Sequence, residues 1–152
     1  MATAIHRLVE SARRGDDPTV IARLPSGWAV FGRQQFLHGY ALLLPDPVVP
    51  DLNALSLAPR AQFLADMAAL GDALLATTGA LRINYAMFGN LEPALHAHVV
   101  PRYADEAASL RNAHPWAYDW AAAPAFDAAG LAGLKAALRA KLGAARGVRP
   151  GD

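Results

Sequence analysis

The chain of 152 residues contains no cysteine. This absence excludes a disulfide framework, a thiol nucleophile and any metal site built on thiolates, and it leaves histidine, aspartate and glutamate as the possible metal ligands. A chain without cysteine is also compatible with a reducing compartment, and we expect the protein to be cytoplasmic.

Charge and long hydrophobic runs are both scarce. Charged residues make up 18% of the sequence and the formal net charge is +1, so the chain lacks the basic surface that captures nucleic-acid polymers from a distance. Its apolar runs fall well short of the ~18 residues that cross a bilayer. We therefore expect neither a nucleic-acid polymer nor a membrane as a partner.

Apolar residues are abundant, at 54% of the sequence. This fraction, together with the low charge, excludes disorder for most of the chain. A chain of this length is expected to build one hydrophobic core. We predict a single domain over residues 1–142, followed by a flexible tail over residues 143–152.

The spacing of apolar residues predicts an α+β fold. Apolar runs bounded by proline or glycine predict strands over residues 19–24, 28–31, 40–44, 82–87 and 95–102. Helical spacing predicts a long helix over residues 56–78 and shorter terminal helices over residues 5–12 and 126–142. Because strands both precede and follow the long helix, we expect a five-stranded antiparallel sheet with that helix packed on it. Gly71 inside the long helix marks either close backbone packing or a tolerated defect.

Two histidines, His96 and His98, lie on the last predicted strand. Alternate side chains of a strand share a face, so both imidazoles are expected to point the same way, with Cα atoms roughly 6.5 to 7 Å apart. Such a pair alone is as typical of ordinary surface or core histidines as of metal-binding or catalytic ones. Its flanks are more informative, because Gly89 and Asn90 form a polar turn ahead of the pair and Arg102 places a cation after it.

The segment Asn90–Tyr103 resembles the signature of the histidine triad (HIT) superfamily, His-φ-His-φ-His-φ-φ, where φ is apolar. Its ending, Val-Val-Pro-Arg-Tyr, is similar to that of the dinucleoside polyphosphate (diadenosine tetraphosphate) hydrolase branch. On this alignment His96 matches the central histidine and His98 the third, whereas Ala94 stands in the place of the first. The resemblance extends from about Trp28 to Tyr103.

This resemblance implies a homodimer of HIT-like domains and a hydrolase that needs no cofactor and no metal. In such an enzyme the central histidine, here His96, attacks the α-phosphate of a nucleotide or dinucleotide at a phosphoanhydride or phosphoramidate bond. Water then releases a nucleoside monophosphate from the nucleotidyl-histidine intermediate. His98 is expected to hydrogen-bond phosphate oxygens. The resemblance implies further substrate-binding positions at Asn84 (which requires a one-residue gap), Gly89, Asn90, Leu91 and Arg102.

The sequence departs from the family pattern at Ala94, Gly32 and Tyr40. In the family, the backbone carbonyl of the first position holds the central histidine, and an alanine at position 94 supplies this carbonyl equally well. Gly32 stands where an acid or amide that contacts ribose is expected. Tyr40 stands where a histidine commonly follows glycine, and we assign it to packing. Ala94 and Gly32 support an alternative, a non-catalytic nucleotide-binding module that retains the pocket.

Two other interpretations stay open. His96 and His98 could bind zinc if His114, Asp105 or Glu106 supplied a third ligand, since catalytic zinc usually takes three protein ligands. The aromatic residues near the end of the chain could stack on a base, although we expect them to pack in the core or at a subunit interface; they are Trp116, Tyr118 and Trp120.

Overall fold

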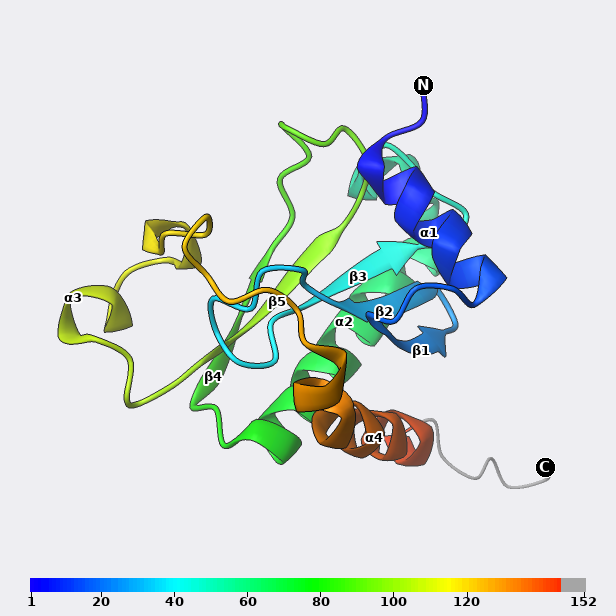
Figure 1. The fold of residues 1–152 in the computed structure, drawn as a ribbon. Helices are drawn as coiled ribbons and strands as arrows, with labels where there is room; N and C mark the ends of the chain where they lie inside the picture. The colour runs from blue at the N-terminus through cyan, green and yellow to red at the C-terminus, as the bar shows by residue number, and fades with distance from the viewer. Residues whose placement is uncertain (146–152) are drawn as a thin grey trace.

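The computed structural model describes residues 1–145 and contains one five-stranded antiparallel sheet (Figure 1). The strand order is β1-β2-β3-β5-β4, so β1 and β4 are the two edges. The strands are β1 (Val20–Leu24), β2 (Gly27–Phe31), β3 (Ala41–Pro45), β4 (Arg82–Ala86) and β5 (Ala97–Arg102). The predicted α+β fold, with its antiparallel sheet and long helix, is confirmed.

The helices follow the predicted order. The α-helices are α1 (Ala4–Arg14), α2 (Leu57–Thr78), α3 (Ala108–Arg111) and α4 (Ala128–Ala145), and the 3-10 helices are η1 (Leu52–Ala54) and η2 (Pro115–Ala117). Helix α4 continues through Ala145, three residues past the predicted boundary at residue 142; residues 146–152 of the predicted tail lie outside the described residues. Among residues 1–145, no helix is long and apolar enough to cross a membrane.

One face of the sheet carries the main hydrophobic core. Ala29, Leu43 and Val99 point from neighbouring strands toward α2, where Phe63 and Leu70 pack against them. The second long helix, α4, packs on α2 and adds further leucines to the same cluster. This core fixes which residues of each strand face the helices and leaves the alternate residues on the opposite face.

Gly71 in α2 marks a close approach between this helix and the edge strand β4. A Cβ atom added at Gly71 would lie 2.0 Å from the hydroxyl oxygen of Tyr85. A side chain at this position therefore requires Tyr85 to move away, and the glycine allows the ring to rest against the helix. The close-packing interpretation of Gly71 is confirmed.

Two segments of the chain cover the opposite face of the sheet. Over β2 and β3, Ile5 and Val9 of helix α1 pack against Val30 and Leu44. The segment between β5 and α4, which includes α3 and η2, passes over the remaining part of this face (yellow to orange in Figure 1). His96 and His98 lie on the surface between these two segments.

Candidate functional site

His96 and His98 lie next to each other on the sheet face opposite α2. Their ring centroids are 5.0 Å apart and their planes meet at 71°. Strand β5 begins only at Ala97, because the amide of Leu95 donates to the carbonyl of Val49 instead of joining the sheet ladder. His96 therefore lies just before β5 and His98 within it. Both side chains are partly exposed and line the same cavity of about 490 Å³.

The ring of His96 is held by the backbone of Ala94. Nδ1 of His96 lies 2.8 Å from the Ala94 carbonyl oxygen, the contact that the sequence predicted for this position. Because a carbonyl oxygen only accepts, Nδ1 carries the proton and Nε2 of the neutral ring keeps its lone pair. No hydrogen bond among residues 1–145 uses this Nε2. The methyl group of Ala94 is buried against α1.

The ring of His98 is held by Tyr40. The Tyr40 hydroxyl oxygen lies 2.7 Å from His98 Nδ1, and the two rings are stacked with centroids 6.0 Å apart. We assigned Tyr40 to packing; it is buried among aromatic side chains, but its hydroxyl also reaches the candidate site, so that assignment was incomplete. The contact arises from the pairing of Leu42 with His98, since Tyr40 lies two residues before Leu42 on the same face, and no local pattern of the sequence indicates this pairing.

Burial keeps both members of this pair neutral. It lowers the pKa of His98 to about 4, and the neighbouring His96 contributes to the same shift. Burial also raises the pKa of Tyr40 above its ordinary value. At neutral pH the imidazole therefore carries one proton and the phenol keeps its own.

A loop over residues 88–92 forms one wall of the 490 Å³ cavity. Gly89 has a φ of +73°, in the left-handed region that favours glycine, and Asn90 and Leu91 are exposed. The carboxylate of Glu92 accepts a hydrogen bond of 3.1 Å from the backbone amide of Ala4, which ties the loop to the start of α1. The structure thus brings three of the expected substrate-binding positions, Gly89, Asn90 and Leu91, to the two histidines.

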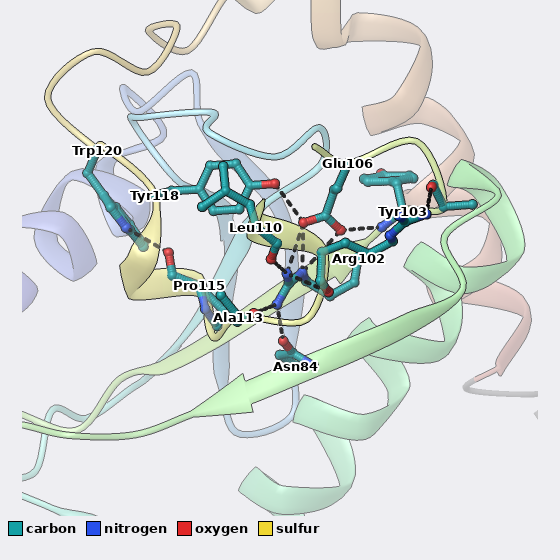
Figure 2. Close-up of polar contacts among 11 residues, drawn as sticks. Asn84, Arg102, Tyr103, Glu106, Leu110, Ala113, Pro115, Tyr118 and Trp120 are labelled. Carbon is teal, nitrogen blue, oxygen red and sulfur yellow. Dashed lines mark hydrogen bonds and ion pairs between the residues drawn. The ribbon is translucent and has the colours of Figure 1, made fainter. Parts of the chain in front are cut away.

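Arg102, an expected substrate-binding residue, does not line this cavity. Its guanidinium instead contacts Asn84, Glu106 and the segment after β5 (Figure 2). Its side chain is 7% exposed and forms an ion pair with Glu106. The guanidinium also donates to Asn84 Oδ1 at 2.8 Å and to the backbone carbonyls of Leu110 at 2.9 Å and Ala113 at 2.7 Å. A buried cation is stable only when its donors are satisfied, and these contacts use all five N–H groups. Arg102 therefore fastens the segment after β5 onto the sheet.

Asn84 is likewise directed away from the histidines. Its Oδ1 accepts from Arg102, and it pairs with Val100 on β5, beyond His98. It lines a neighbouring cavity of about 560 Å³ along β4 and η2, which shares Phe88 and Trp116 with the cavity of the two histidines. The structure therefore does not bring the predicted substrate-binding Asn84 into the cavity that His96 and His98 share.

The aromatic residues of the segment after β5 divide into two roles. Trp120 packs on Phe36 with ring centroids 4.0 Å apart, and Tyr118 packs on the same ring, as expected for core residues. Trp116 instead lies edge-on to His98, with centroids 4.9 Å apart, and forms a wall of the cavity. It also meets Phe88 edge-on at 4.9 Å, so that two aromatic side chains border the site.

A metal site is not supported by the arrangement of ligands. Within residues 1–145, no group of three or more histidine, aspartate or glutamate side chains is close enough to hold an ion. Glu106, one of the suggested third ligands, accepts hydrogen bonds from Arg102 and Tyr118 instead. The site consists of two adjacent imidazoles, one loop and an aromatic wall.

Comparisons with known proteins identify similar folds. No family model matches the sequence, and no curated protein matches it. Among solved structures, a histidine triad protein from Bradyrhizobium japonicum has 27% identity and a TM-score of 0.72, over 86% of this chain and 95% of that one. A histidine triad protein from Marinobacter aquaeolei VT8 has 17% identity and a TM-score of 0.73, over 94% and 98% of the two chains. A hypothetical histidine triad nucleotide-binding protein from Sulfolobus tokodaii strain 7 has 10% identity and a TM-score of 0.72, over 96% and 98%.

Proposed function

We propose that this chain, which has the fold of the histidine triad proteins, hydrolyses a nucleotide phosphoanhydride or phosphoramidate through a nucleotidyl-histidine intermediate. Nε2 of His96 attacks the α-phosphorus, and the bond from phosphorus to the leaving oxygen or nitrogen breaks. Water then attacks the same phosphorus, the bond to Nε2 breaks, and a nucleoside monophosphate is released. The leaving group takes its proton from solvent.

The contact between His96 Nδ1 and the Ala94 carbonyl carries this proposal. It directs the lone pair of the neutral imidazole to Nε2, which makes this nitrogen a nucleophile at neutral pH. When Nε2 bonds to phosphorus the ring becomes cationic, and the same carbonyl stabilises the Nδ1–H of that cation. The contact survives with alanine at position 94 because the backbone supplies it.

The cavity supports a role in binding phosphate. His98 borders it beside His96, and the loop with Gly89, Asn90 and Leu91 lines it, so that backbone amides of this loop are candidate phosphate donors. N–H groups directed at a phosphoryl group stabilise the charge that builds up during transfer. The aromatic side chains of Phe88 and Trp116 provide apolar surface for the organic part of the substrate.

The test is a small substrate panel, containing an adenosine phosphoramidate and diadenosine polyphosphates, with release of nucleoside monophosphate as the readout. His96→Ala should abolish turnover, and acid quenching of the wild type should trap a nucleotidyl adduct on His96. His38→Ala is the matched control, because His38 is exposed and outside the cavity. Turnover that persists in His96→Ala would overturn the mechanism.

A nucleotide-binding module without turnover is the second candidate. It is favoured by Gly32 and Tyr40: a Cβ at Gly32 would lie 2.1 Å from the Tyr40 ring, so this ring fills the place where a ribose-binding side chain was expected. The same panel separates the candidates. Saturable binding of nucleotides without product, and without an effect of His96→Ala on binding, identifies the module.

We also propose that the protein forms a homodimer through β4. This strand is an edge of the sheet, and two large apolar side chains are exposed there, Tyr85 within the strand and Leu81 just before it. An unpaired edge with apolar neighbours is normally covered. Sedimentation equilibrium should give twice the chain mass, and Tyr85→Lys should lower it to that of a monomer.

A further inference from the structure

Tyr40 and His98 are 58 residues apart in the sequence, yet their polar atoms lie 2.7 Å apart. The contact arises because β3 and β5 are paired, with Leu42 opposite His98, and Tyr40 lies on the same face just before β3. Since the two groups are neutral, two arrangements are possible. Either the phenol donates to Nδ1, or Nδ1–H donates to the phenol oxygen.

The surroundings of the phenol distinguish these arrangements. Tyr40 is 3% exposed, and His98 Nδ1 is the hydrogen-bond partner of its hydroxyl within residues 1–145. If Nδ1–H were the donor, the hydroxyl proton would be buried without an acceptor, which is costly. If the hydroxyl donates, both atoms are satisfied and the single imidazole proton is on Nε2.

We propose that Tyr40 is a positioning residue that donates its hydroxyl proton to His98 Nδ1 and thereby holds His98 as the Nε2–H tautomer. His98 then presents a hydrogen-bond donor at its other ring nitrogen. The identity of the acceptor, a phosphate oxygen of the substrate, rests on the proposed function; the tautomer itself does not. His96, held by a carbonyl, has the opposite tautomer, with the proton on Nδ1. The two adjacent imidazoles thus present different groups: Nε2 of His96 carries a lone pair, and Nε2 of His98 carries a proton that it can donate.

The packing around Tyr40 fixes the position of its hydroxyl. Its ring contacts Phe36 at a centroid distance of 5.0 Å and meets the edge of Trp120 at 5.2 Å. Gly32 leaves room for the ring on the remaining side. The segment that carries Trp120 therefore contributes to the orientation of His98 through Tyr40, without contacting the substrate.

The direct test is the tautomer of each histidine, measured by long-range ¹H–¹⁵N correlation on protein labelled with ¹⁵N-histidine. In the wild type, His98 should show a protonated Nε2 and an unprotonated Nδ1, and His96 the reverse. Tyr40→Phe should shift both ring-nitrogen signals of His98 toward a mixture of tautomers. A wild-type His98 protonated on Nδ1, or a Tyr40→Phe spectrum identical to that of the wild type, would overturn the proposal.

Tyr103→Phe is the matched control. It removes a hydroxyl from the same aromatic cluster, but this hydroxyl donates to the backbone carbonyl of His38 and does not touch His98. Its histidine signals should match those of the wild type. The spectra require no substrate, so they test the tautomer even if the protein proves inactive.

A double-mutant cycle tests the consequence for ligand binding, with adenosine monophosphate as the probe. Tyr40→Phe should weaken binding about threefold to tenfold, the effect of one hydrogen bond, and should have no further effect in a His98→Ala background. A loss that is the same in both backgrounds would mean that Tyr40 acts on the fold and not through His98. If the probe does not bind at all, the proposed function fails, while the spectra still decide the role of Tyr40.

Discussion

The rings of His96 and His98 are inclined at 71° with their centroids 5.0 Å apart. Inclined rings direct their edges along different lines, and both rings border the same cavity, so a single group bound there can meet two imidazole edges. Each ring is held through its Nδ1 by a different partner, a backbone carbonyl for His96 and a phenol for His98. The orientation of the pair is therefore set by the protein before a substrate binds.

The first prediction concerns His98 in catalysis. Replacing it with alanine removes a donor at the developing charge, and we expect kcat to fall about 10²- to 10³-fold, the range found for the loss of one such group. His98→Gln, whose amide can also donate, should retain more activity than His98→Ala. Steady-state kinetics on the best substrate of the panel measures both. Equal activity of His98→Ala and wild type would contradict a role in phosphate stabilisation.

The second prediction concerns the pH dependence of stability. The pKa of His98 is lowered to about 4 from the ordinary value of 6.5. Between these pH values the unfolded chain binds a proton at this residue and the folded chain does not, so the free energy of unfolding falls as the pH decreases from 6.5 toward 4. His98→Gln, which cannot titrate, should lose less stability over this interval. Urea unfolding of both proteins near pH 7 and near pH 5 measures the difference, and parallel losses would contradict it.

The third prediction separates a structural Arg102 from a phosphate-binding one. Arg102→Met leaves Glu106 buried without its cation, and we expect the free energy of unfolding to fall by about 3–5 kcal/mol. Arg102→Lys should not restore it, because an ammonium has three donors where the guanidinium has five. Urea unfolding without ligand makes the measurement. The exposed Arg111→Met is the control and should change stability by less than about 0.5 kcal/mol. Unchanged stability with a raised KM would instead place Arg102 in the binding site.

The fourth prediction concerns Gly32. An added Cβ would meet the ring of Tyr40 at 2.1 Å, so Gly32→Ala should destabilise the protein by about 1–3 kcal/mol through overpacking. Gly133→Ala is the contrasting variant, because it lies within α4 and its added Cβ meets nothing within 4 Å. We expect it to stabilise the protein by about 0.5–1 kcal/mol. Thermal unfolding of the two variants should give shifts of opposite sign.

Local patterns predicted the fold well. The strands β2 and β3 are short apolar runs next to glycine or proline, and α2 ends at Thr78, the last residue of the predicted range, with Gly79 in the left-handed conformation after it. The contact of His96 with the carbonyl of position 94 was expected from the resemblance to the HIT signature, and it joins neighbours in the chain through a backbone atom. These features depend on residues that are close in sequence.

The errors concern contacts between distant segments. The burial of Arg102 depends on carbonyls of Leu110 and Ala113, in a segment without regular periodicity that gives no sign of folding back on the sheet. The contact of Tyr40 with His98 depends on the pairing of β3 with β5, which are not consecutive because α2 and β4 lie between them in the chain. Neither the path of the segment nor the strand order follows from local spacing.

The hydrogen bond from the Ala4 amide to Glu92 connects the N-terminal end of the chain to the rim of the cavity. No residue of α1 lines that cavity, but the carboxylate of Glu92 occupies the positive end of the α1 dipole and so shares in the stability of the helix. We expect truncation of α1, or a bulky affinity tag fused close to Thr3, to break this hydrogen bond and so to loosen the loop that carries Gly89 and Asn90. Proteins prepared with the tag at the other end are therefore the appropriate material for kinetic work.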